Sequence, residues 1–183
     1  MEQPSKGDFF EPVYESLKSS LKPVICAARG LCLGGGAGIV LASDIRIISN
    51  TTRMGWPHAK LGLCSMNAPC SLARAIPINI ALELMFTGDL IDADRIVHLG
   101  LANHVVPDAE LESFAEGMRR KILASAPLAV RAAKEATTTT REVPYAEAVH
   151  RTRKIFDKLI CSIDAQEGMR AFFEKRRPTW KAR

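Results

Sequence analysis

The sequence predicts an α/β fold in which a strand, a glycine turn, a helix and a strand are followed by a region made almost wholly of helices. Three observations support this prediction. A short apolar run, Pro23 to Ala28, lies between a proline and a glycine cluster. Residues Asp44 to Ser49 alternate polar with apolar side chains, and the apolar spacing becomes helical from about Asn79.

The first half of the chain reads as one crossover unit. The stretch "EPVYESLKSSLK" has helical spacing and stops at Pro23, after which the apolar run is typical of a buried strand. Residues Gly34 to Ser43 should open a short buried helix, and Asp44 to Ser49 should form a half-buried strand. A strand, helix and strand in this order indicate a parallel sheet with a right-handed connection.

The second half is predicted from helix boundaries. Helices are expected at Ile80 to Phe86 and Asp92 to Leu99, with one more strand at "NHVVP". The boundary signals that follow are two expected N-caps and two prolines suited to a first turn: Asp108, Asp164, Pro127 and Pro144. Because no repeat, low-complexity tract or linker interrupts the chain, we expect a single domain over residues 1–183.

The glycine stretch Gly30 to Gly38, "GLCLGGGAG", holds five of the chain's twelve glycines. Its spacing matches neither the P-loop nor the dinucleotide-binding fingerprint. A strand that passes through glycines into a helix presents unpaired N–H groups, which suit an anion or an oxygen that gains negative charge. The alternative is that the glycines only allow the helix to pack closely on the strand.

The residues around these glycines resemble the crotonase family, the enoyl-CoA hydratase/isomerase superfamily. The similar segments begin with "KPVICAARGLCLGGGAGIVLASDIRI" from Lys22 and continue through "MGWPHAKLGL" from Met54. They include "FTGDLIDADRIVHLGLANHVVP" from Phe86 and "GMRAFFEKRRPTW" from Gly168. The resemblance covers nearly the whole chain, from about Lys22 to Trp180.

The resemblance implies a crotonase-like ββα superhelix, with a core part at about 22–107 and a C-terminal helical oligomerisation region at about 108–183. It implies self-association as a homotrimer or a dimer of trimers, and a coenzyme A thioester as ligand. In the family, two backbone N–H groups hold the thioester oxygen as it becomes an enolate, and by position Gly35 is one of the donors. This role requires that the amides near residue 35 are not already bonded within the protein.

Two positions that carry glutamates in hydratases of this family differ here. Gly38 stands at the first and His58 at the second. Hydration needs one group to take a proton from water and another to deliver a proton to carbon. Glycine cannot transfer a proton, whereas His58 can, so His58 is the candidate acid or base, with an ordinary loop histidine as the alternative.

Two further departures from the family pattern concern the acyl pocket and the start of the chain. The segment Leu61 to Arg74 lacks the family's glycines, so the acyl pocket should be reshaped and narrower; Ser65 and Asn67 are candidate polar contacts there, or plain loop residues. Family members carry a longer segment before Lys22, which includes the second oxyanion donor. A short gene product, an alternative start and a fragment all fit this sequence.

The basic C-terminus favours an anionic partner. The formal net charge is +5, and Lys175, Arg176 and Arg177 match the family's basic terminal helix, which often lies near the phosphates of coenzyme A. These three residues are therefore candidate cofactor-binding residues. Nucleic acid is not favoured, because no stacking aromatics are interleaved with the basic residues and no RNA-binding motif is present. A solvated charged face is the simpler alternative.

Composition indicates a cytoplasmic protein without a membrane span, a metal site or a tightly bound cofactor. No apolar run approaches the length of a membrane span, and the first residues do not read as a secretory signal. The five cysteines form no C-x-x-C pair and are interpreted as small buried hydrophobes. His98 and His104 lack metal-ligand spacing, and Asp89 is expected from turn chemistry.

Three functional hypotheses remain open from the sequence. The first is a crotonase-type enzyme that polarises an acyl-CoA thioester through Gly35 and transfers a proton through His58. The second is a non-catalytic protein of the same fold that binds coenzyme A thioesters or serves as an assembly subunit. The third, RNA binding through the basic helices, is the weakest.

Overall fold

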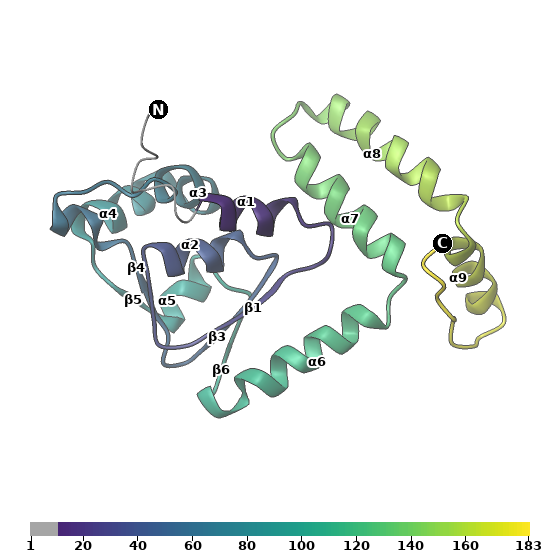
Figure 1. Ribbon diagram of the computed structural model, residues 1–183, viewed down its shortest axis with the longest axis horizontal. Helices are drawn as coiled ribbons and strands as arrows, with labels where there is room; N and C mark the ends of the chain where they lie inside the picture. The colour runs from purple at the N-terminus through teal and green to yellow at the C-terminus, as the bar shows by residue number, and fades with distance from the viewer. Residues whose placement is uncertain (1–10) are drawn as a thin grey trace, which may run out of the picture. The chain divides into compact units, whose positions relative to one another are not determined.

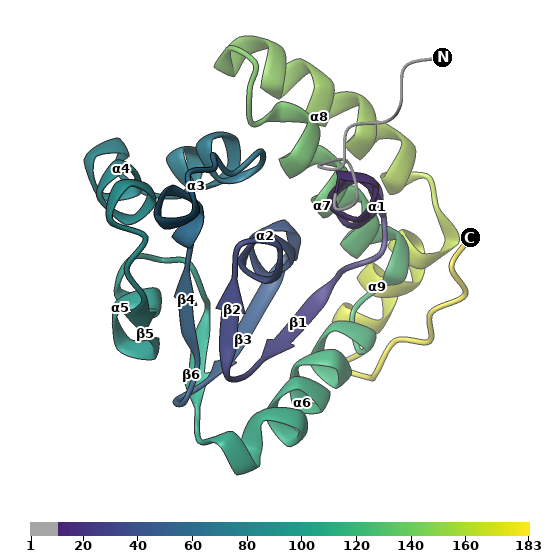
Figure 2. The same ribbon diagram turned by 60° about the vertical axis from the view of Figure 1, so that its left-hand side comes forward.

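The computed structural model describes residues 11–183, which form two compact units. The N-terminal unit contains residues up to 20 and 24–117, and the C-terminal unit contains 21–23 and 118–183. Figures 1 and 2 show the strands and short helices of the first and the long helices of the second. Each unit is described by itself, and the single-domain organisation stays a prediction.

The N-terminal unit is built from short strands and helices in close succession. Its strands are β1 (Ile25–Ala28), β2 (Leu31–Leu33), β3 (Ile45–Ser49), β4 (Arg53–Gly55), β5 (Ile91–Asp92) and β6 (His104–Val106). Its helices are α1 (Glu11–Ser19), α2 (Gly35–Ala42), η1 (Pro57–Leu61), α3 (Ala68–Ala75), α4 (Ile78–Thr87), α5 (Ala93–His98) and η2 (Asp108–Glu110). Helix α6 (Leu111–Leu123) contains the boundary between the two units.

Two three-stranded sheets form the framework of this unit. One has the order β1-β3-β6 and is parallel throughout. The other has the order β2-β4-β5, with β2 and β4 parallel and β5 antiparallel to β4. The chain passes from β1 to β2 before α2, and from β3 to β4 before η1. Each of these turns therefore adds one strand to each sheet and then a helix. The predicted α/β fold with a parallel sheet is confirmed.

The core lies where α2 and α3 meet the strands. Its largest fully buried side chains include Trp56, Ile48, Met54 and Leu72. Helix α2 is apolar all round because it packs against β2, α1 and α3. Arg46 of β3 closes the C-terminal end of α2, since its guanidinium donates to the carbonyls of Leu41 at 2.7 Å and Ser43 at 3.1 Å.

The C-terminal unit consists of helices. Helix α7 (Pro127–Thr140) pairs with α8 (Tyr145–Ile160), and α9 (Ile163–Phe173) follows. In Figure 1 the chain after α9 turns back along that helix. The buried carboxylate of Asp164 accepts hydrogen bonds from the amides of Lys181 at 2.6 Å and Ala182 at 2.9 Å, which fixes this return.

Two expected caps are wrong. Pro107 precedes a 3-10 turn that contains Asp108, whose carboxylate instead accepts from Arg29 and Thr51. Ser162, not Asp164, caps α9 by accepting from the amide of Ala165 at 3.1 Å. In both cases the acidic side chain bonds to a distant segment, which sequence spacing does not reveal.

Some local predictions are confirmed and others corrected. Pro127 does open α7, whereas Pro144 is the residue before α8 rather than within its first turn. Helix α3 and strands β2 and β4 were not predicted from the sequence. The cysteines are free, but burial holds only for Cys32 and in part for Cys26; the other three are exposed: Cys64, Cys70 and Cys161.

Candidate active site at the glycine turn

The sheet brings the glycine turn and the loop of His58 to one edge. Strands β2 and β4 run parallel, with Leu33 opposite Gly55, and the amide of Gly34 donates to the carbonyl of Gly55 at 3.0 Å. Parallel strands end at the same edge of a sheet, so the turns that follow them lie side by side. Residues separated by more than twenty positions thereby meet.

Gly34 must be glycine for two reasons. Its φ of 48° lies in the left-handed region. A Cβ built on Gly34 would also lie only 3.0 Å from Cε1 and 3.2 Å from Nε2 of His58. The imidazole therefore lies directly against the turn, which links His58 to the glycine stretch.

The amides at the start of α2 differ in whether they are bonded. The first intrahelical hydrogen bond runs from the amide of Gly38 to the carbonyl of Gly34 at 3.0 Å. Gly34 itself donates to Gly55, and it provides no side-chain cap. Among residues 11–183, no hydrogen bond from the Gly35 amide is found, as expected at a helix N-terminus. The amide that the sequence singled out therefore meets the requirement of being unbonded.

His58 lies in η1 and is partly buried. Its Nδ1 atom is buried and, among the described residues, has no hydrogen-bond partner. An imidazole without a partner that fixes its tautomer can carry its proton on either nitrogen. The nitrogen beside Gly34 is Nε2, so this is the atom that can exchange a proton at the turn.

Gly38 is buried in α2, and the side chain of Tyr14 from α1 lies over it. A Cβ at position 38 would lie 2.5 Å from the Tyr14 hydroxyl oxygen and 2.7 Å from Cζ. The hydroxyl donates to the carbonyl of Gly35 at 3.1 Å. Tyr14 was not predicted as a site residue; the available signal was Gly38 on an otherwise apolar helix, since a neighbouring side chain had to fill the space at this position.

The residues proposed as acyl-pocket contacts have local partners. The hydroxyl of Ser65 accepts from the amide of Ala68 at 3.1 Å. At Asn67 the backbone carbonyl, and not the side chain, accepts from the amide and the hydroxyl of Ser71 in α3. Asp89 pairs with Lys60 at 2.8 Å, and this hydrogen bond lowers the pKa of the Asp89 carboxyl. These contacts shape the segment that follows His58.

The three basic candidates of the C-terminal unit are not equivalent. Arg176 donates to Glu167 at 2.6 and 2.9 Å and to Glu174 at 2.5 Å, so carboxylates already engage its guanidinium. Lys175 and Arg177 are exposed. The hydrogen bond from Arg176, aided by the amide of Thr179, lowers the pKa of Glu167 to about 2.

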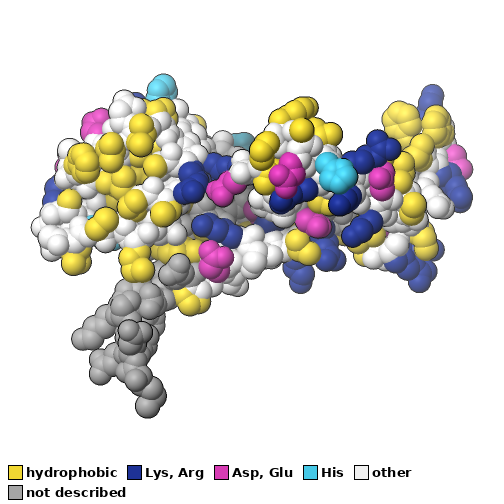
Figure 3. Space-filling view, turned by 90° about the horizontal axis from the view of Figure 1, so that it is seen from above, with side chains coloured by type: hydrophobic (Ala, Val, Ile, Leu, Met, Phe, Trp, Pro, Cys, Tyr) yellow, Lys and Arg dark blue, Asp and Glu magenta, His cyan; other side chains and the backbone are white. Residues whose placement is uncertain are grey.

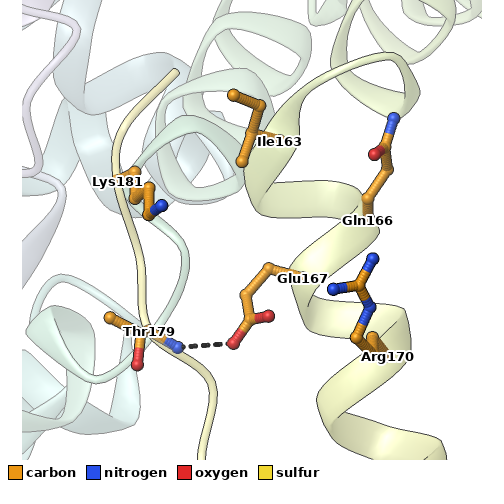
Figure 4. Close-up of a pocket in the computed structure, with 6 residues that line it drawn as sticks. All are labelled: Ile163, Gln166, Glu167, Arg170, Thr179 and Lys181. Carbon is orange, nitrogen blue, oxygen red and sulfur yellow. Dashed lines mark hydrogen bonds between the residues drawn. The ribbon is translucent and has the colours of Figure 1, made fainter.

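A pocket of about 350 Å³ lies within the C-terminal unit beside this ion pair (Figure 4). Its lining is Ile163, Gln166, Glu167, Arg170, Thr179 and Lys181. Figure 4 shows the carboxylate of Glu167 directed from α9 toward Thr179, whose amide donates to it at 2.9 Å. Glu167 is therefore used to hold the C-terminal segment against α9.

The described residues provide neither a metal-binding cluster nor a membrane-spanning helix. In the part of the chain that the structure describes, no three His, Cys, Asp or Glu side chains come together in a way that would hold a metal ion. None of the helices described between Glu11 and Phe173 combines the length and apolar character that a bilayer crossing requires.

Comparison with known proteins gives one consistent result. Residues 2–183 match the family described as enoyl-CoA hydratase/isomerase. The chain is 33% identical over 172 residues to (E)-benzylidenesuccinyl-CoA hydratase of Thauera aromatica, covering 93% of this chain and 67% of that protein. It is 37% identical over 167 residues to carnitinyl-CoA dehydratase of Shigella flexneri, covering 88% and 64%. The chain thus spans about two thirds of the length of these curated relatives.

Solved structures agree with the sequence relatives. An enoyl-CoA hydratase from Bacillus anthracis aligns with a TM-score of 0.92 at 32% identity, covering 95% of this chain and 68% of that one. An enoyl-CoA hydratase/isomerase from Mycobacterium paratuberculosis aligns with a TM-score of 0.90 at 32% identity, covering 98% and 73%. The crotonase-type fold is therefore confirmed, and the chain belongs to the enoyl-CoA hydratase/isomerase family.

Proposed function

We propose that this chain binds an acyl-CoA thioester at the glycine turn and catalyses a hydratase-type or isomerase-type reaction on it. The Gly35 amide would donate to the thioester oxygen as that oxygen gains charge, and His58 would transfer a proton. The observation that carries the proposal is the contact of the His58 imidazole with the turn whose next amide is unbonded. The names of two relatives, a hydratase and a dehydratase of CoA thioesters, support it.

The electrostatics of the turn favour this role. Helix α2 has no acidic residue in its first turn, so the partial positive charge of its N-terminus is not neutralised there. An oxygen that becomes an enolate oxygen would be stabilised by this charge and by the Gly35 donor. The coenzyme A is part of the substrate, so the reaction as proposed needs no tightly bound cofactor.

The C-terminal basic residues are proposed to contact the phosphates of coenzyme A. Lys175 and Arg177 are exposed and carry charges suited to phosphate. Arg176 belongs to the same cluster, but its pairing with Glu167 and Glu174 makes it the least available of the three. Replacing Lys175 and Arg177 with alanine should weaken coenzyme A binding in calorimetry, while Lys158→Ala serves as the matched control.

Self-association is proposed through the helical region. Its helices expose large apolar side chains: Phe156, Met169, Phe172 and Phe173. Figure 3 shows hydrophobic and basic side chains next to one another on one face of the molecule. Exposed apolar surface of this kind is typical of subunit contacts. A second copy of this chain, in a homotrimer or a dimer of trimers, is the proposed partner, and a monomer in light scattering at micromolar concentration would contradict this.

The enzymatic proposal is tested with crotonyl-CoA and a short panel of other acyl-CoA esters. The absorbance of the conjugated thioester reports turnover, and calorimetry reports binding. Turnover that is lost in His58→Ala but kept in the matched His98→Ala variant would support the proposal. Binding without turnover would favour the second hypothesis, a non-catalytic subunit that binds coenzyme A thioesters.

A further inference from the structure

Tyr14 fills the space that a side chain at position 38 would occupy. The phenol is 6% exposed and packs between α1 and α2, and the position of a Cβ on Gly38 lies within 2.8 Å of three of its atoms. No real Cβ could be accommodated at that distance without moving the ring. The position of the Tyr14 ring therefore requires a glycine at position 38.

The phenol and the imidazole flank the same turn of α2. The Tyr14 hydroxyl donates to the carbonyl of Gly35 and lies over Gly38, while His58 lies against Gly34. Gly34 and Gly38 are one helical turn apart and are joined by a backbone hydrogen bond of 3.0 Å. The Tyr14 hydroxyl is thus bonded to the carbonyl of Gly35, and the His58 imidazole lies beside Gly34, the residue before the Gly35 amide.

We propose that Tyr14 is the second proton-transferring residue of this site and replaces a side chain at position 38 in that role. The inference rests on the proposed function, because it concerns the same bound thioester. It also answers how a site with glycine at that position could complete a reaction that needs two proton transfers. His58 of η1 would transfer one proton, and Tyr14 of α1 would transfer the other.

The direction of each transfer follows from chemistry. Burial raises the pKa of the Tyr14 phenol, so the hydroxyl keeps its proton at neutral pH and acts as a donor. In hydration, the His58 Nε2 takes a proton from water as the water oxygen bonds to the β-carbon. The electron pair of the double bond moves to the thioester enolate, and the α-carbon then takes the proton of the Tyr14 hydroxyl. Solvent returns a proton from the imidazolium to the phenolate, so all atoms balance.

The test is Tyr14→Phe, which removes the hydroxyl and keeps the ring. With crotonyl-CoA in D₂O, the wild-type protein should place one deuteron on one face of the α-carbon of the hydroxyacyl product. Tyr14→Phe should lower kcat by about 10²-fold or more, with little change in KM, and should lose the selectivity for one face. Tyr145→Phe, a variant of an exposed tyrosine, is the matched control and should behave as the wild type.

A second variant distinguishes loss of proton transfer from a general disturbance of packing around Tyr14. Tyr14→Ala combined with Gly38→Glu opens the space and places a carboxylate in it, so activity should rise above that of Tyr14→Ala alone. A Tyr14→Phe enzyme that deuterates one face at the wild-type rate would overturn the role of Tyr14 and leave the proposed function intact. A slower enzyme with unchanged face selectivity would also overturn it, since that result indicates a packing role. Absence of turnover by the wild-type protein would overturn both.

Discussion

The two compact units differ in how they bury their side chains. In the N-terminal unit, strands and short helices enclose a core that includes Ile47, Met54, Trp56 and Leu72. In the C-terminal unit, α7 and α8 have no buried residue among those that the structure describes, and large apolar side chains stay exposed. Its own core lets the N-terminal unit hold the atoms of the site in fixed positions. The C-terminal unit instead exposes apolar side chains that are available for contact with a partner.

The largest effect on stability is therefore expected in the N-terminal unit. Replacing Trp56, which is 1% exposed, with alanine should reduce the free energy of unfolding by about 3–5 kcal/mol, because it leaves a cavity in the core. Replacing the exposed Lys154 of α8 with alanine should change it by less than about 0.5 kcal/mol. Denaturant unfolding of both variants measures the contrast, and similar losses would contradict it.

A second large effect is expected on catalysis. Gly35→Pro removes the proposed donor at the first position of α2, where the amide makes no intrahelical bond. Because proline also restricts the residue before it, and Gly34 has φ 48° and ψ −105°, some loss of stability is expected as well. We expect kcat on an acyl-CoA substrate to fall about 10²–10³-fold, as for loss of one oxyanion donor. Gly117→Ala in α6 is the control, because a Cβ there meets no atom within 4 Å. Unchanged turnover in Gly35→Pro would remove the Gly35 amide from the mechanism.

Features set by local pattern were predicted from the sequence better than features set by tertiary contacts. The glycine stretch, the long helices and His58 were identified because local patterns and a family resemblance carry that information. The role of Tyr14 was missed, because no spacing between residues 14 and 38 reveals that α1 packs on α2. The caps at Asp108 and Asp164 failed for the same reason, since each carboxylate bonds to a segment distant in sequence. What depends on tertiary contact had to come from the structure.

In the C-terminal unit, a moderate loss of stability is expected when the buried carboxylate of Asp164 is removed. Asp164→Ala leaves the amides of Lys181 and Ala182 without their acceptor, which should cost about 1–3 kcal/mol. The matched control is Asp157→Ala, whose carboxylate forms an exposed pair with Arg153, and it should cost less than about 1 kcal/mol. Hydrogen exchange of residues 177–183 should accelerate in Asp164→Ala alone. Equal protection in both variants would show that other contacts hold this segment.

The smallest expected effect is a pH dependence of the same segment, set by Glu167. Its folded-state pKa, about 2, lies below the ordinary value of 4.5, so the contact with Arg176 and Thr179 stabilises the folded state above pH 4.5. That contribution should disappear as the pH falls from 4.5 toward 2. The amide resonance of Thr179, which donates to the Glu167 carboxylate, should report the titration in an NMR series. In Glu167→Gln the acceptor oxygen remains but the titration should vanish, and a Thr179 shift that still titrates there would assign the effect to another group.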